Sequence, residues 1–219
     1  MKPKRFDLLI FDWDGTLMDS AGAIASCIQA ACADMGLSIP SREAARHVIG
    51  LGLREALIHL FPELPEAEYP LLADHYRRHF LGQDHDILLF EGARELIMEL
   101  HGDGFRLAVA TGKARRGLDR AFSHTGLERY FHASRTADET FSKPHPLMID
   151  ELLDELDISP ARALMIGDTS HDLDMARNAG VHSLAAGYGA HPAEHLNAYG
   201  ALRVCTSFVE LANWLREHA

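Results

Sequence analysis

Apolar residues form a short continuous run near the start of the chain, and this run ends abruptly in Asp12-Trp13-Asp14-Gly15-Thr16. A short apolar run closed by a glycine is typical of a buried strand in an open α/β sheet. Residues two apart in a strand point to the same side, so a regular strand would turn Asp12 and Asp14 toward one pocket. Asp-Gly is also common turn chemistry, and an acidic turn without catalytic meaning is the alternative.

After Thr16 the apolar positions change to helical spacing and keep that spacing as far as residue 82. Ser20 is a candidate N-cap and Gly36 a candidate stop for the first helix, and Ser41 is a candidate N-cap for the second. The pattern predicts helices at 20–35, 41–49, 53–61 and one that ends near 82, followed by a connection at 83–89. An α/β sheet normally returns to a strand after one helix, so these helices indicate an insertion.

The rest of the chain alternates between strand and helix patterns, which is typical of a parallel sheet with right-handed crossovers. Strands are expected at 106–110, 132–134, 163–166 and 182–185, and helices at 93–101, 115–124, 146–156, 172–179 and 207–216. The sequence therefore predicts an α/β fold, a doubly wound parallel sheet with a small all-helical cap inserted after the first strand. We expect residues 1–16 and 90–219 to form the core domain and residues 17–89 a cap domain that acts as a lid.

The composition is that of an ordinary globular protein, with 219 residues of which 47% are hydrophobic. A formal net charge of -11 argues against nucleic acid as a partner, because binding its phosphates requires a basic surface. Three cysteines without a CxxC pair favour a reducing compartment, and no signal peptide is recognised, so we expect a cytoplasmic protein. No stretch approaches the roughly 18 apolar residues of a membrane span, so no membrane partner is expected. The oligomeric state, monomer or dimer, stays open.

Two later strand ends and one loop also carry residues that suit phosphate or metal chemistry. Thr111 and Gly112 offer a hydroxyl and a backbone N–H that an oxyanion can approach closely, although such a pair also serves as a turn or a helix cap. Lys143 stands in a loop stiffened by two prolines, where a solvated lysine is the plainer interpretation. Asp168 and Asp172 follow another strand, and carboxylate ligands of this kind match Mg²⁺. Asp172 either ligates the metal, directly or through water, or only caps the next helix.

The order of these motifs resembles the haloacid dehalogenase superfamily over nearly the whole chain: DxDGT, then a strand followed by Thr-Gly, then Lys-Pro, then Gly-Asp-xxx-Asp. The helical insert resembles the small cap of the phosphoglycolate phosphatase-like branch. This resemblance implies a Mg²⁺-dependent phosphatase that hydrolyses a small phosphomonoester, such as phosphoglycolate or a sugar phosphate, through an aspartyl-phosphate intermediate. A small phosphorylated metabolite is accordingly the expected partner.

The same resemblance implies a role for each motif. Asp12 attacks phosphorus, and a carboxylate can do so because it is ionised at neutral pH and needs no activating base. Asp14 protonates the leaving oxygen and then activates the hydrolytic water. Three residues bind the transferring phosphoryl group: Thr111, Gly112 and Lys143. The implied metal ligands are Asp12, the carbonyl oxygen of Asp14, and Asp168.

Other reactions within the family fit the residues less well. A dehalogenase would not be expected to keep an acid at position 14, and a phosphonoacetaldehyde hydrolase needs a cap lysine, whereas no lysine lies between Arg5 and Gly112. A phosphomutase resembling β-phosphoglucomutase keeps every motif and differs mainly in excluding water from the aspartyl-phosphate, so it stays the alternative. A catalytically silent binding module is disfavoured by the intact acids.

Several smaller features bear on the pocket. Arg54, in the sequence Gly-Leu-Gly-Leu-Arg, is a candidate contact between the cap and an acidic group of the substrate. Trp13 is bulkier than the aliphatic residue expected between the two acids, and Gly112 stands where the family often has asparagine. Two histidine pairs have the four-residue spacing of metal ligands, but a solvated helix face is the favoured interpretation: His75 with His79, and His191 with His195.

Overall fold

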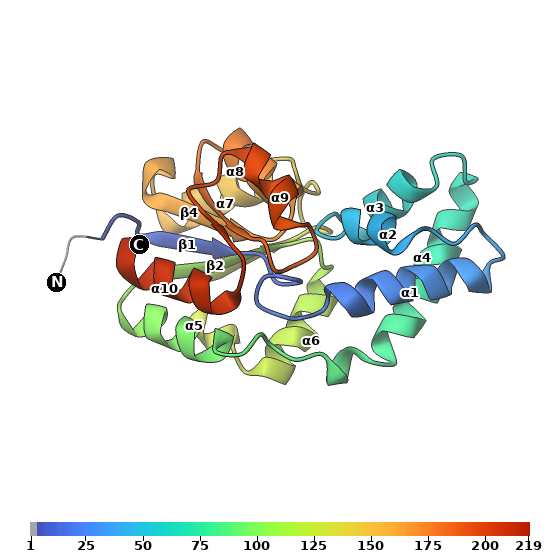
Figure 1. Cartoon of the computed structure of the whole chain (residues 1–219), viewed down its shortest axis with the longest axis horizontal. Coiled ribbons are helices and arrows are strands. Elements are labelled where there is room, and N and C mark those ends of the chain that lie inside the picture. Colours follow the sequence, from blue (N-terminus) through green and yellow to red (C-terminus); the bar gives the residue numbers. More distant parts are fainter. Residues whose placement is uncertain (1–3) are drawn as a thin grey trace.

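The computed structural model describes residues 4–219 and contains a six-stranded parallel sheet in the order β3-β2-β1-β4-β5-β6 (Figure 1). The strands are β1 (Leu8–Phe11), β2 (Arg106–Thr111), β3 (Ala133–Thr136), β4 (Ala163–Gly167), β5 (His182–Ala186) and β6 (Val204–Cys205). Strand β1 is central, and Phe11 aligns with Val109 of β2 and with Ile166 of β4. The carboxyl ends of these three strands therefore meet at one edge of the sheet.

Helices cover both faces of this sheet, as the sequence predicts for a doubly wound fold (Figure 1). Leu9 and Phe11 of β1 are fully buried on one face, and Leu8 and Ile10 are fully buried on the other. Each such side chain contributes about 2 kcal/mol of burial free energy. The first face packs against α5 (Ala93–Gly102), α6 (Arg115–Thr125) and α10 (Phe208–His218), and the second against α7 (Leu147–Leu156) and α8 (Ser170–Asn178).

The predicted helical insertion is present between β1 and α5, beyond one end of the sheet (Figure 1). It consists of α1 (Ala21–Asp34), α2 (Arg42–His47), α3 (Leu53–Leu60) and α4 (Tyr69–Leu81). Helix α1 packs against both α2 and α4, and the buried side chains of Ile28, Leu57 and Leu72 lie in the core of the insertion. We call these four helices and their loops the insertion; the exact domain boundaries at residues 16 and 90 stay a prediction.

The chain enters and leaves the insertion along two adjacent segments. The Asp19 N–H donates to the Leu88 carbonyl at 3.0 Å, and the Phe90 N–H donates to the Leu17 carbonyl at 2.9 Å. Met18 and Leu89 form an antiparallel bridge between these bonds. We call residues 17–19 and 88–90 the paired connection, because the two segments are bonded to each other.

Differences from the predicted elements have local causes. Helix α8 begins at Ser170, two residues before the predicted start, because Thr169 and Asp172 form a capping box. Ser41 caps α2 as predicted, but Ser20 makes no capping bond to α1. The pattern missed β6 and α9 (Ala193–Leu196), which are too short to show a period. Short 3₁₀ turns lie at Glu66–Glu68, Asp84–Asp86, Glu128–Tyr130, Pro160–Arg162 and Asn197–Tyr199.

Two general predictions can be compared with the described residues 4–219. None of the helices there is long and apolar enough to cross a membrane. Cys27, Cys32 and Cys205 are buried and free. Burial raises the pKa of the Cys32 thiol to about 11 and that of the Cys205 thiol to about 12, so both side chains behave as small apolar core residues.

Candidate active site

The two acids of the first motif lie in a turn and not in the strand. Strand β1 ends at Phe11, and Asp12 and Asp14 both line a cavity of about 780 Å³ between the sheet edge and the insertion. The Asp12 side chain is fixed because its Oδ1 accepts a 2.6 Å bond from the Trp13 N–H. The Trp13 ring is fully buried and packs edge-on against Phe122, with centroids 5.2 Å apart. The bulky ring thus fills the core beside α6.

Gly15 and Thr16 connect the first motif to the last one. Gly15 has a φ of +74°, and a side chain there would collide with the Asp168 carboxylate. The Thr16 hydroxyl donates to Asp168 Oδ1 at 3.0 Å, and the Ala190 N–H donates to Asp168 Oδ2 at 2.6 Å. Asp168 is therefore held firmly at both oxygens, beside β1.

Asp12, Asp168 and Asp172 bring three carboxylate oxygens within 4.8 Å of one another, and all three residues are buried. No other group of three such ligands is found among residues 4–219. Burial raises the pKa of Asp12 to about 7, and burial with the neighbouring carboxylates raises the pKa of Asp168 well above its usual range. Within the described chain, Asp12 Oδ2 has no hydrogen-bond donor. A hard divalent cation fits this oxygen-only, electron-rich cluster.

Lys143 lies inside this cluster and is not the solvated loop lysine of the plainer interpretation. Its side chain is fully buried, and its Nζ lies 3.0 Å from Asp12 Oδ2 and 2.6 Å from Asp172 Oδ1. The first contact is an ion pair without hydrogen-bond geometry, which is why Asp12 Oδ2 still lacks a donor. Desolvation disfavours the ammonium, but the two carboxylates outweigh this effect and raise the pKa of Lys143.

Asp172 has the capping role that the sequence left open. Its Oδ2 accepts bonds from the Thr169 N–H at 3.1 Å and the Thr169 hydroxyl at 2.6 Å, while its Oδ1 faces Lys143. A side chain on Gly167 would collide with Asp172, so the glycine at the end of β4 makes room for this arrangement. Direct ligation of a metal by Asp172 stays a prediction.

Strand β2 brings Thr111 and Gly112 to the rim of the same cavity. The Thr111 side chain is buried, and its Oγ1 accepts a 3.2 Å bond from the Lys113 N–H. A side chain on Gly112 would collide with the carbonyl groups of Gly50 and Leu51 in the insertion. Glycine at this position therefore permits close contact between the sheet edge and the insertion.

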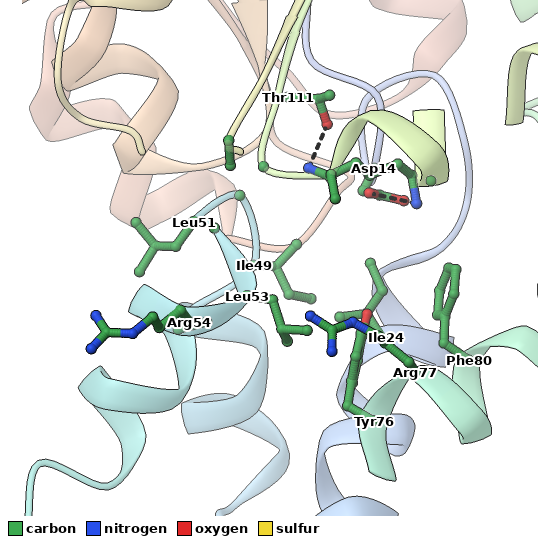
Figure 2. A pocket seen from close by; sticks show the side chains of 18 of the residues that line it. Asp14, Ile24, Ile49, Leu51, Leu53, Arg54, Tyr76, Arg77, Phe80 and Thr111 are labelled. Carbon is green, nitrogen blue, oxygen red and sulfur yellow. Dashed lines mark hydrogen bonds and ion pairs between the residues drawn. The ribbon is translucent and has the colours of Figure 1, made fainter. Parts of the chain in front are cut away.

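The insertion supplies the other wall of the cavity, which is largely apolar. Figure 2 shows Ile24, Ile49, Leu53 and Phe80 facing the space below Asp14 and Thr111. The Arg54 side chain is 57% exposed, pairs with Glu66 and is directed away from Asp14 (Figure 2). Its contact with a substrate stays a prediction.

Sequence reasoning missed two residues that contact Asp14. Ser20 Oγ donates to Asp14 Oδ1 at 2.6 Å, and Lys113 Nζ lies 3.0 Å from Asp14 Oδ2. Ser20 was missed because the sequence pattern indicated only a role as a helix cap. Lys113 carried a usable signal, because it is one of four lysines in the chain and directly follows Thr111-Gly112.

Histidines tie the insertion to the sheet edge. The His47 carbonyl at the end of α2 accepts bonds from His171 Nε2 at 2.9 Å and His191 Nε2 at 3.0 Å, and the His47 and His191 rings stack. Burial lowers the pKa of His191 to about 4, so this ring is neutral at pH 7. His75 and His79, the pair of histidines on α4, contact the same carboxylate oxygen of Asp34, at 2.9 Å and 2.8 Å respectively.

Comparison with known proteins agrees with this geometry. A family model described as haloacid dehalogenase-like hydrolase matches residues 9–186. The chain is 34% identical over 217 residues to "Probable phosphatase IndB" of Dickeya dadantii, covering 96% of this chain and 92% of that protein. It is 30% identical over 216 residues to a 5'-nucleotidase of Pseudomonas aeruginosa, covering 98% and 97% respectively.

Solved structures show the same fold. A hydrolase from Pseudomonas syringae superposes with a TM-score of 0.89 at 23% identity, covering 96% of this chain and 98% of that one. Together with the match over residues 9–186 and the buried acidic cluster, these relatives show that the chain belongs to the haloacid dehalogenase-like hydrolase family and is a phosphatase of that family.

Proposed function

We propose that the protein is a Mg²⁺-dependent phosphatase that hydrolyses a small phosphomonoester, such as phosphoglycolate or a sugar phosphate, through an aspartyl-phosphate on Asp12. The observation that carries the proposal is the environment of Asp12. Its Oδ2 is buried, lacks a hydrogen-bond donor among residues 4–219, and lies beside both Lys143 and the carboxylates of the acidic cluster. An oxygen so placed is available to a metal or to phosphorus.

Residues that would hold the metal are Asp12, the carbonyl oxygen of Asp14, and Asp168. When ionised, the carboxylates of Asp12, Asp14, Asp168 and Asp172 exceed the ammonium groups of Lys113 and Lys143 by two charges, which one divalent cation offsets. A bound Mg²⁺ supplies charge neutralisation for the phosphoryl oxygens and orients the substrate. Both carboxylate oxygens of Asp172 already accept hydrogen bonds, from Lys143 and from Thr169, so Asp172 holds Lys143 in place beside the proposed metal ligands.

The protein groups then have defined tasks. An oxygen of Asp12 attacks phosphorus while the bond from phosphorus to the leaving oxygen breaks, and Asp14 gives that oxygen its proton. Asp14, now a carboxylate, takes a proton from water as the water attacks phosphorus and the bond to Asp12 breaks. Phosphate leaves and both acids return to their first state. Thr111, Gly112 and Lys143 bind the phosphoryl oxygens during both displacements.

Two further observations support hydrolysis of a phosphomonoester. The relatives include proteins named phosphatase and 5'-nucleotidase. The cavity of about 780 Å³ is bounded by residues of the insertion, so closure of the insertion would exclude bulk water and leave its side chains to select the substrate.

The decisive experiment replaces the nucleophile. Asp12→Asn should reduce hydrolysis of p-nitrophenyl phosphate by on the order of 10⁴-fold or more, because the amide cannot form the phosphoenzyme. Turnover by the wild type should require Mg²⁺ and stop after chelation. Asp86→Asn, at a side chain that is 77% exposed and outside the cavity, should retain activity. Full activity in Asp12→Asn would exclude the proposed nucleophile, and faster phosphate transfer to a sugar phosphate than to water would identify a phosphomutase.

A further inference from the structure

The carboxylate of Asp14 is held at both oxygens by groups that lie at the border of the insertion. Ser20, which precedes α1, donates to Oδ1, and Lys113, which follows β2, forms an ion pair with Oδ2 (Figure 2, dashed line at Asp14). The side chains of Lys113 and Asp14 are both only 10% exposed. Water therefore screens this ion pair far less than an ion pair on the surface.

Lys113 also contacts the insertion. Its Nζ lies 4.7 Å from the centroid of the Phe80 ring on α4, which is the geometry of a cation–π contact. The Lys113 backbone is fixed, since its N–H donates to Thr111 Oγ1 at 3.2 Å and its carbonyl accepts from the Ala137 N–H at 3.0 Å. Only the side chain can follow a movement of α4.

We propose that Lys113 is a positioning residue for Asp14, and that Phe80 makes this positioning depend on where the insertion sits. With α4 in place, Phe80 covers the lysine and the ammonium stays on Asp14 Oδ2. With α4 displaced, the ammonium loses its aromatic neighbour and becomes exposed to water. The proposal rests on the acid and base role of Asp14 in the proposed function, and it adds two residues that none of the catalytic motifs contains.

The chemical benefit concerns the first displacement. In the protonated acid, Oδ2 still faces Lys113 and Oδ1 carries the proton, while the Ser20 hydroxyl donates to its second acceptor, the Met18 carbonyl at 3.3 Å. Asp14 passes this proton to the leaving oxygen, which keeps the electron pair of the broken bond to phosphorus, and Asp14 becomes a carboxylate. Lys113 keeps its own protons and stabilises that carboxylate in the position from which the proton left. The benefit is large when the leaving group is an alkoxide, which must be protonated, and small for p-nitrophenolate, which leaves without help.

The test compares two leaving groups in one variant. Lys113→Met removes the charge but keeps an unbranched side chain, and it should lower kcat/KM for β-glycerol phosphate by about tenfold or more. Its kcat/KM for p-nitrophenyl phosphate should fall by less than about threefold, which also shows that the variant is folded. Phe80→Leu, which keeps apolar volume without a π face, should produce a loss of roughly twofold to fivefold, again confined to the alkyl phosphate.

Controls separate this proposal from the one on which it rests. Lys4→Met removes a lysine that also covers an aromatic ring, Phe105 at 4.0 Å, but lies far from the site, and it should change neither kcat/KM value. If Asp14→Asn lowers kcat/KM, which reports the formation of the phosphoenzyme, equally for both substrates, the acid role itself is wrong. A different result overturns the proposal for Lys113 alone: Asp14→Asn lowers kcat/KM more for β-glycerol phosphate than for p-nitrophenyl phosphate, but Lys113→Met lowers kcat/KM equally for both substrates or for neither. The proposed function then stands.

Discussion

Lys143 carries its charge in a place that water does not reach. Its side chain is fully buried between Asp12 and Asp172, and these carboxylates keep it protonated. Such a network is weak evidence for net stability, because desolvating three charges is costly, but removing one partner leaves the others buried and unpaired. The lysine is therefore part of the buried charge network of the fold as well as of the proposed phosphate site.

Lys143→Met tests this coupling. Measured by urea unfolding without Mg²⁺, the free energy of unfolding should fall by about 3–5 kcal/mol, because two buried carboxylates lose their cation. Arg203→Met removes an exposed basic residue paired with Glu210 and should leave the unfolding midpoint close to that of the wild type. An unchanged midpoint in Lys143→Met would show that the buried carboxylates do not depend on the lysine.

At the residue scale, the sequence identified the groups that meet at the sheet edge but not their partners. Asp12, Asp14, Thr111 and Asp168 follow predicted parallel strands, whose carboxyl ends lie at one edge of a sheet, so their convergence was predictable. The place of Lys143 beside them was implied only by the family resemblance. The ion pair between Lys113 and Asp14 was missed although Lys113 directly follows Thr111-Gly112, because a lysine side chain is long and no local pattern determines which carboxylate it contacts.

At the scale of the elements, a contact between two loops determines how close the insertion lies to the sheet edge. The turn after β2 touches the loop between α2 and α3 at Gly112, with the carbonyl groups of Gly50 and Leu51 where a side chain would be. Gly50 itself has a φ of +94° and lies against Thr169. Backbone-to-backbone contact of this kind fixes how closely the insertion approaches the turn that we propose binds phosphate.

Gly112→Ala should therefore displace the insertion from the site. We expect kcat/KM for p-nitrophenyl phosphate to fall by about tenfold to hundredfold, since a shift on the order of 1 Å misaligns the reacting groups. Gly102→Ala, where a methyl group meets no atom within 4 Å, is the matched control and should keep full activity. Wild-type kcat/KM in Gly112→Ala would mean that this loop contact does not set the geometry of the site.

Element prediction succeeded where apolar spacing is long and failed where it is short. The four helices of the insertion follow a clear helical period, and β1, β2, β4 and β5 stand out as apolar runs. Strand β6 has two residues and α9 has four, so each spans only about one period and shows no repeat. The predicted start of α8 was two residues late because Asp172 is not the first residue of the helix. It is the third (N3), and it forms a capping box with Thr169.

For the whole molecule, the contact between α2 and the sheet edge makes stability depend on pH. Burial lowers the pKa of His191 to about 4, and burial also lowers the pKa values of His47 and His171. In the unfolded chain these rings titrate near pH 6.5. Between pH 6.5 and 4 these three rings take up protons in the unfolded chain that they do not take up in the folded chain, so the contribution of these histidines to stability falls as the pH falls.

His191→Gln isolates the largest of these effects. The stability difference between wild type and variant should be nearly constant above about pH 7.5, and it should move by about 2 kcal/mol in favour of the variant on going to pH 4.5. Urea unfolding at a series of pH values with Mg²⁺ present measures this difference. A difference that does not vary with pH would show that His191 titrates normally in the folded protein.

The paired connection has a consequence for how such a protein can change. Because residues 17–19 and 88–90 are bonded to each other, the polypeptide between them leaves and rejoins the core at one place, and β1, β2 and β4, whose ends position Asp12, Thr111 and Asp168, contain no residue of the insertion. A gene segment coding for residues 21–87 can therefore be exchanged as one cassette that leaves Ser20 on Asp14, and a new insertion that again places an aromatic ring over Lys113 would bring new walls around the leaving group.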